Sequence, residues 1–199
     1  MSASATLSPS SWQRSGPGSA QAVGLWAFIG VASSLFALFV AAYVMRMSEA
    51  DAIRLVLPWQ LAASTLALAA SSLLFAQAAR VQPDVVMQAL RWAGACALAF
   101  IALQVGSWQA LLDSQVTLRG NPAGSFFFLL TAMHGLHLLG GLVAWWLTLR
   151  ALARSGGAAR WRVTLCARYW HFLLAVWLLL LAMMAWITPE RAAWICGRS

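Results

Sequence analysis

The chain has 199 residues, of which 62% are hydrophobic and only 9% are charged, and its mean hydropathy is +0.75. Soluble domains carry roughly 25% charged residues, so this composition excludes a soluble globular protein and indicates an integral membrane protein. The net charge of +8 comes from thirteen arginines and no lysine. Because the arginines cluster between apolar runs, they favour a topology signal and contact with lipid headgroups over nucleic-acid binding.

Five runs of residues are free or nearly free of charge and long enough to cross a bilayer core of roughly 30 Å as helices. They are 22–45, 57–79, 92–112, 125–149 and 169–188. The sequence therefore predicts an all-α fold, an integral membrane bundle of five transmembrane helices within 22–188. Residues 1–21, rich in Ser, Gly and Pro, are expected to form a flexible tail, and residues 189–199 a second, short tail.

The ends of the spans carry local signals. Turn-forming residues at 119–124 and 153–160 are expected to separate the later spans, and Pro189 is expected to end the fifth. Tryptophans lie near several predicted ends and are interpreted as anchors at the membrane interface: Trp92, Trp108, Trp145, Trp146, Trp170 and Trp186.

The arginines also predict an orientation. Five spans place the two termini on opposite sides of the membrane, and one side then holds eight arginines against five on the other. Positively charged loops stay cytoplasmic, so the N-terminus is expected inside and the C-terminus outside. The connection between the fourth and fifth spans supplies most of this difference, with Arg150, Arg154, Arg160, Arg162 and Arg168.

Two histidines, His134 and His137, lie within the fourth apolar run, at a depth where ionisable side chains are costly and often functional. At helical spacing, His134 shares one stripe with Thr131, Leu138 and Gly141, and His137 flanks it. The small residues Gly140 and Gly141, next to this stripe, are expected to allow another helix to approach closely. We therefore expect both histidines to face a protein neighbour.

A metal site built on these histidines is not expected. His171 lies close to the start of the fifth predicted span, so at ~1.5 Å per residue it differs from His137 in depth by on the order of 13 Å. Zinc–nitrogen bonds are only ~2 Å long, and no carboxylate lies within a predicted span. Three scattered cysteines form no CxxC pair. The residues favour structural histidines that hydrogen-bond to a neighbouring helix, and they leave open a proton relay or a headgroup contact.

Two stretches resemble the signature helices of cytochrome c oxidase subunit III, namely "FFFLLTAMHGLHLLGGL" at 126–142 and "RYWHFLLAVWLLLLAMMAW" at 168–186. The segments 24–46 and 100–108 resemble two further motifs of that family, and the resemblance covers about 22–188, in the short five-helix bacterial form. The motif residues that carry over are Trp26, Phe36, Tyr43, Gln104, Trp108, Thr131, His134, Gly135, His137, Gly141, Tyr169, Trp170, His171, Phe172 and Trp177.

The chain departs from the family pattern at three positions where the family has an acid within the membrane. Ala32 and Ser107 stand in place of glutamates, and Leu174 stands in place of an aspartate. A proton-carrying carboxylate role is therefore not expected. Packing and lipid binding remain compatible with the residues present.

The resemblance implies an accessory subunit III, without a redox metal or catalytic site of its own, in a bacterial haem–copper terminal oxidase. Haem and copper are expected on partner subunits, with subunits I and II as neighbours in the bacterial inner membrane, and phospholipid as a ligand. The expected lipid-binding or packing residues are His134, His137, Arg160, Arg162, Arg168, Trp170 and His171. Trp170 and the arginines are expected to hold lipid headgroups.

Two alternatives remain beside this interpretation. Within the same superfamily, the chain fits a subunit III-like component of a quinol oxidase or a nitric oxide reductase. In a different class, it fits a small stand-alone transporter, although the charged groups, broken helices and repeats usual in transporters are not visible in its sequence.

Overall fold

The computed structural model describes residues 19–47, 58–113, 122–155, 159–187, 191, 192 and 194. Within these residues there are five long α-helices and no β-strand. They are α1 (Ser19–Met47), α2 (Gln60–Arg80), α3 (Pro83–Asp113), α4 (Pro122–Ser155) and α5 (Arg160–Trp186). All five are long and apolar enough to cross a membrane, so the prediction of an all-α, multi-pass membrane bundle with five spans is confirmed.

Four helices begin earlier than their apolar runs predict, α1 and α4 by three residues and α3 and α5 by more. Both α3, at Pro83, and α5, at Arg160, begin nine residues before the expected span. An apolar run marks only the part of a helix in hydrocarbon, whereas backbone hydrogen bonding continues beyond it. The expected turn at 119–124 is also partly helical, because α4 begins at Pro122, a residue suited to a first helical position.

The other expected ends of the helices are confirmed only in part. Residues 153–155 of the expected loop 153–160 belong to α4, and Arg160 belongs to α5. Pro189 and residues 119–121 and 156–158 lie outside the described residues. The helices therefore extend further along the chain than the apolar spans alone indicate.

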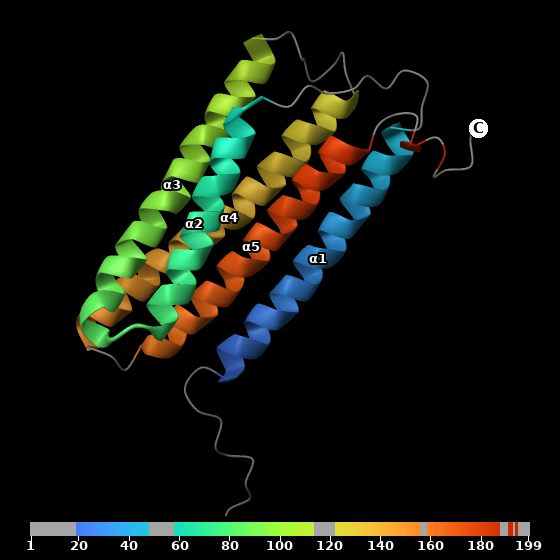
Figure 1. Cartoon of the computed structure of the whole chain (residues 1–199). Coiled ribbons are helices and arrows are strands. Elements are labelled where there is room, and N and C mark those ends of the chain that lie inside the picture. Colours follow the sequence, from blue (N-terminus) through green and yellow to red (C-terminus); the bar gives the residue numbers. More distant parts are fainter. Residues whose placement is uncertain are drawn as a thin grey trace, which may run out of the picture.

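Successive helices run in opposite directions (Figure 1). The first residues of α1, α3 and α5 lie at one end of the bundle, and the last residues of these helices lie at the other end. The α2–α3 and α4–α5 connections therefore share an end with the start of α1, as the arginine count for the two sides of the membrane assumes. Which end faces the cytoplasm stays a prediction from the arginine distribution.

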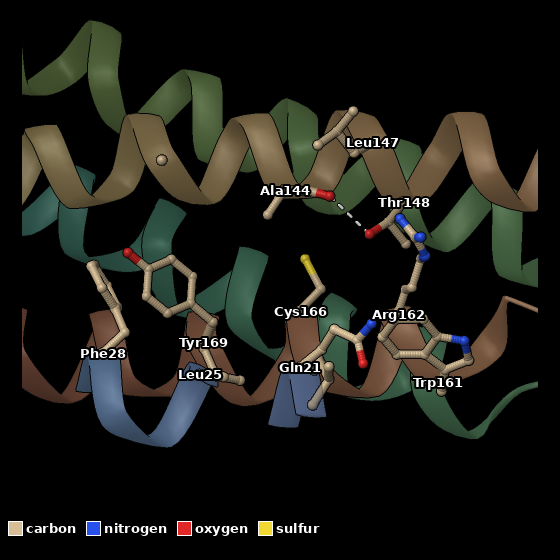
Figure 2. Close-up of a pocket in the computed structure, with 12 residues that line it drawn as sticks. Gln21, Leu25, Phe28, Ala144, Leu147, Thr148, Trp161, Arg162, Cys166 and Tyr169 are labelled. Atoms are coloured by element: carbon tan, nitrogen blue, oxygen red, sulfur yellow. Dashed lines mark hydrogen bonds between the residues drawn. The ribbon is translucent and has the colours of Figure 1, made fainter. Parts of the chain in front are cut away.

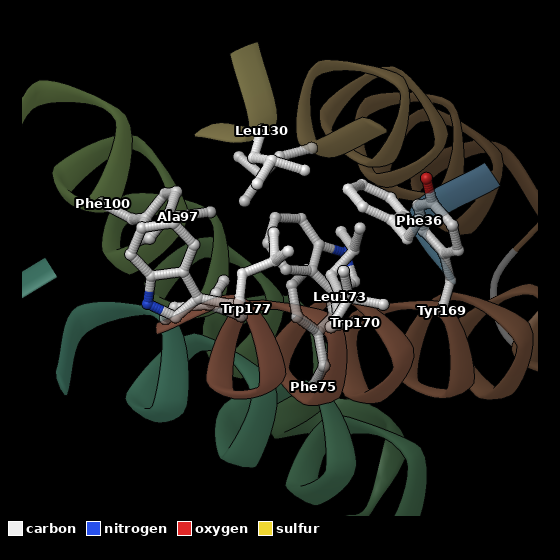
Figure 3. Close-up of a cluster of buried hydrophobic side chains, with 14 of the residues drawn as sticks. Phe36, Phe75, Ala97, Phe100, Leu130, Tyr169, Trp170, Leu173 and Trp177 are labelled. Atoms are coloured by element: carbon white, nitrogen blue, oxygen red, sulfur yellow. The ribbon is translucent and has the colours of Figure 1, made fainter. Parts of the chain in front are cut away.

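Helix α5 lies at the centre of the packing, because it contacts α1, α2 and α4. Its largest buried side chains are Trp170 and Trp177. The Trp170 ring stacks on Phe75 of α2, with 4.7 Å between centroids, and the Trp177 ring meets Phe100 of α3 edge-on at 5.2 Å. Figure 3 shows these rings between the helices that they join. Aromatic pairs of this kind add to the burial of apolar area.

Hydrogen bonds between helices supplement this packing. The Ser71 hydroxyl of α2 donates to the Ala93 carbonyl of α3 at 2.8 Å. The Trp177 indole N–H donates to the Thr65 hydroxyl of α2 at 2.9 Å. Each such bond contributes roughly 1 kcal/mol or less in a membrane, and together they fix the order in which the helices pack.

Candidate functional site

His134 lies in the interior of the bundle, with 0% of its surface exposed. Its ring is surrounded by rings from three other helices: Phe36 of α1 at 6.5 Å, Phe100 of α3 at 5.9 Å and Trp177 of α5 at 5.3 Å between centroids. Neither ring nitrogen has a hydrogen-bond partner among the described residues. The imidazole therefore fills space in an aromatic core, and the expectation that it hydrogen-bonds to a neighbouring helix is wrong.

His137 lies one turn away and at the edge of the core. Its Nδ1 contacts the Met133 carbonyl of its own helix at 2.7 Å, and its ring lies 5.7 Å from Phe28 and 5.3 Å from Phe36 on α1. The Tyr169 hydroxyl of α5 donates to the His137 carbonyl at 2.9 Å. His137 thus contributes to the contact between α4 and α1, and through its backbone to the contact with α5.

The glycines beside the histidines differ in their surroundings. A methyl group built on Gly141 would lie 3.0 Å from the Tyr169 ring and 3.4 Å from Leu173, so Gly141 permits the close approach of α5. The same construction on Gly140 meets nothing within 4 Å, so the close approach expected there is not found among the described residues. The predicted stripe is therefore a packing face, with Thr131, His134 and Leu138 all buried.

His171 belongs to a different surface of the bundle. Its Nδ1 lies 2.6 Å from the Ser72 hydroxyl of α2, and its side chain is otherwise exposed. Gly141 packs against Tyr169 and Leu173, which flank His171, so Gly141 and His171 lie at about the same depth. His137 precedes Gly141 by four residues on α4. The depth difference between His137 and His171 is therefore about 6 Å, less than the sequence predicts. The early start of α5 explains the difference. The histidines are separated mainly by direction, since His137 faces α1 and His171 faces α2.

Uncharged residues occupy the three positions where the family pattern has acids. Ala32 and Ser107 are buried, and the Ser107 hydroxyl donates to the Leu103 carbonyl of its own helix at 2.9 Å. Leu174 is half-buried. Within the described part of the chain, no three His, Cys, Asp or Glu side chains gather closely enough to hold a metal ion.

Several tryptophans interpreted as interface anchors instead join helices. Trp170 is fully buried, so the expectation that it holds a lipid headgroup is wrong. The Trp108 indole donates to the Thr131 hydroxyl at 3.0 Å, and the Trp145 indole donates to the Leu90 carbonyl at 2.8 Å. By contrast, Trp92, Trp146 and Trp186 are 61%, 49% and 67% exposed, as an interface position requires.

Sequence reasoning missed the glycine on which Trp145 packs. A methyl group on Gly94 of α3 would overlap the Trp145 ring. The pairing joins residues 51 positions apart, and only the isolated Gly94 within an apolar run could have signalled it. Gly94 and Trp145 together set the distance between α3 and α4.

The other motif residues are distributed through the bundle. Trp26 on α1 is 59% exposed, Gln104 on α3 is buried, and Gly135 and Phe172 are half-buried. The structure therefore does not bring all the motif residues to one place. It gathers the motif residues Phe36, His134 and Trp177 in the core and leaves Trp26 on the outside.

A cleft of about 420 Å³ opens between α1, α4 and α5 near the expected cytoplasmic end. Its apolar part is lined by Leu25 and Phe28 of α1, with Tyr169 of α5, and Figure 2 shows Arg162 and Trp161 toward the opposite end. An adjoining hollow of about 510 Å³ shares Arg162 and is lined by two further arginines, Arg150 and Arg154. The combined surface is apolar at depth and cationic at the mouth.

The predicted headgroup arginines do not act alike. The exposed Arg162 guanidinium lies over the Trp161 ring at 5.0 Å, beside the cleft. Arg160 instead donates through Nη2 to the Val81 carbonyl at 2.6 Å, which ties the start of α5 to the end of α2. Arg168 is exposed on α5 and does not line either hollow.

Several curated proteins are similar in sequence to this chain. No family model matches the chain. The chain is 30% identical over 92 residues to the probable cytochrome c oxidase subunit 3 of Mycobacterium tuberculosis, with 45% of each chain covered. It is 30% identical over 90 residues to the protein of that name from Nocardia farcinica, with 44% of each covered. It is 33% identical over 97 residues to the cytochrome bo(3) ubiquinol oxidase subunit 3 of Pseudomonas aeruginosa, with 46% of each covered.

The match therefore spans less than half the length of these curated relatives. The names of these relatives confirm the resemblance to subunit III that the stretches at 126–142 and 168–186 predict.

Proposed function

We propose that this chain is an accessory, non-redox subunit III of a bacterial haem–copper terminal oxidase, resident in the inner membrane. The observation that carries the proposal is its similarity to relatives named subunit 3 of a cytochrome c oxidase and of a ubiquinol oxidase. In this proposal the chain packs beside catalytic subunit I, with subunit II in the same complex. Haem and copper belong to those partners, and the chain supports oxygen reduction and proton uptake.

The electron donor divides this proposal into two candidates. The mycobacterial relative is named for cytochrome c oxidase and the Pseudomonas relative for ubiquinol oxidase, at similar identity. The second name favours a quinol oxidase as the other candidate complex. A copper-binding subunit II that docks cytochrome c supports the first candidate if it co-purifies with the chain, and its absence from an active complex supports the second.

The buried side chains support an accessory role. The core around His134 is aromatic, and the indoles of Trp177 and Trp108 each donate a hydrogen bond to a threonine of another helix. The uncharged Ala32, Ser107 and Leu174 offer no carboxylate to carry a proton through the membrane. The contribution proposed for this chain to proton uptake is therefore indirect, through stable packing of the complex and retention of lipid.

The cleft between α1, α4 and α5 is the proposed lipid site. An acyl chain fits beside Leu25 and Phe28, and a phosphate fits at the mouth, where Arg150, Arg154 and Arg162 lie. Guanidinium groups form strong, often bidentate hydrogen bonds with phosphate. The proposed ligand is therefore an anionic phospholipid with its headgroup at the arginine-rich end.

Replacing Arg150 and Arg162 together by Gln is expected to weaken binding of phosphatidylglycerol to the detergent-purified protein. Each arginine near a phosphate contributes about 1 kcal/mol, so the double variant should bind roughly thirtyfold more weakly. Native mass spectrometry of protein titrated with this lipid measures the change. Arg91→Gln, an exposed arginine of α3 at the same end of the bundle, is the control. Equal weakening by Arg91→Gln would indicate a general surface-charge effect.

Purification of the tagged chain from its native membranes in mild detergent tests the proposed function. A large polytopic haem protein is expected to co-purify in a fixed ratio. Isolation of the chain by itself from membranes that contain an intact oxidase would instead favour the stand-alone transporter.

A further inference from the structure

A second apolar groove, separate from the lipid cleft, lies between α3 and α4. It has a volume of about 240 Å³ and follows each helix for eight residues, or about 12 Å, from Phe100 to Trp108 on α3 and from Thr131 to Leu139 on α4. Its lining includes the small Gly135, where an added methyl group would meet nothing within 4 Å. The groove therefore has room for side chains that the described part of this chain does not supply.

One polar group in the groove lacks a partner. Gln104 lines the groove and is only 6% exposed; its Oε1 accepts a long hydrogen bond of 3.5 Å from the Ser64 hydroxyl, while its Nε2 has no partner among the described residues. The other polar pair, Trp108 and Thr131, is satisfied by its own hydrogen bond. An unpaired amide in an apolar surrounding is costly, so it indicates a missing neighbour.

The depth of Gln104 restricts what that neighbour is. Gln104 lies nine residues before Asp113, the last residue of α3, which is about 14 Å along the helix axis. Phospholipid phosphates and ester groups lie at the membrane surface, beyond the reach of this amide. An acyl tail reaches the groove but carries no hydrogen-bonding group. A lipid therefore fills the groove without satisfying Gln104.

We propose that this groove docks a transmembrane helix of a partner subunit, which places a hydroxyl or amide side chain against Gln104. A group that both donates and accepts fits either orientation of the Gln104 amide. Gly135 allows the backbone of the incoming helix to approach closely, as small residues do at helix contacts in membranes. The flanking Val105, Leu136 and Leu139 are 47%, 61% and 51% exposed and extend the contact surface. This inference rests on the proposed function, because it assigns the face toward a partner in the oxidase.

Filling the groove tests the inference. Gly135→Leu adds a side chain at a position where a methyl group meets nothing within 4 Å, so it should leave the isolated subunit folded but reduce co-purified partner at least about tenfold. The control is Gly30→Leu on α1, because a methyl group at Gly30 also meets nothing within 4 Å and Gly30 does not line the groove. Far-ultraviolet circular dichroism and thermal unfolding of the subunit alone verify that both variants fold.

A second variant and a crosslink identify the occupant. Gln104→Leu should leave the isolated subunit as stable as wild type or more stable, yet still weaken the complex about fivefold. A photo-crosslinking residue at Leu136 should join the chain to a partner membrane protein. Crosslinks only to lipid, or only to a second copy of this chain, would overturn the inference.

The two proposals fail in distinguishable ways. If wild type co-purifies with a haem protein and Gly135→Leu does so equally well, the groove is not the docking face, and the proposed function stands. If wild type co-purifies with no haem protein, the proposed function itself fails.

Discussion

Gly94→Ala should destabilise the protein by about 1–3 kcal/mol, the usual cost of adding a methyl group to a well-packed core. The new methyl would overlap the Trp145 ring, which lies against Gly94 and is held by its hydrogen bond to the Leu90 carbonyl. Relief of the overlap requires the indole to move away, and the hydrogen bond is then lost. Unfolding in mixed micelles of mild detergent and dodecyl sulfate, followed by circular dichroism, measures the change.

Gly106→Ala in the same helix is the matched control. A methyl group at Gly106 meets nothing within 4 Å, and alanine is preferred over glycine in a helix by about 1 kcal/mol. The two substitutions are therefore expected to shift stability in opposite directions. If Gly94→Ala proved neutral or stabilising, Trp145 could not be packed on Gly94 as described.

His134 variants should separate packing from hydrogen bonding. His134→Ala leaves a cavity among Phe36, Phe100 and Trp177 and should cost about 2–4 kcal/mol. His134→Leu keeps most of the volume and removes two ring nitrogens that have no partner among the described residues, so it should leave stability unchanged or raise it. The same unfolding measurement on both variants gives the comparison.

A proton-relay role for His134 predicts a different pattern. In that case His134→Leu would retain the assembled complex but lose oxygen consumption, whereas a packing role retains both. His137→Leu gives a comparison with a histidine at the edge of the core, whose Nδ1 contacts the Met133 carbonyl.

The number and type of the helices could be predicted because crossing hydrocarbon demands about 20 apolar residues, and the chain has five such runs. The starts of α3 and α5 could not be predicted, because helical hydrogen bonds continue beyond the point where the hydropathy of the sequence falls. Arg160 and Arg162 are therefore helical, although the apolar runs place them in the connection between the fourth and fifth spans. This shift also reduces the depth difference between His137 and His171.

The buried stripe of α4 follows from helical phase, which correctly places Thr131, His134 and Leu138 on one face. The partners of that face depend on how α1, α3 and α5 pack around it, and no local pattern specifies this. For the same reason a tryptophan near a predicted span end cannot be assigned from sequence alone. Trp146 is exposed there, whereas its neighbour Trp145 inserts toward α3.

The central claim is that this chain works as subunit III within a haem–copper oxidase and carries no redox group itself. Its most direct test is the visible absorption spectrum of the tagged chain purified from native membranes, compared with the same chain expressed and purified alone. We predict a haem Soret band, with copper, in the native preparation and no Soret band in the isolated chain. A bis-histidine haem spectrum from the isolated chain, or a native preparation without haem, would contradict the account.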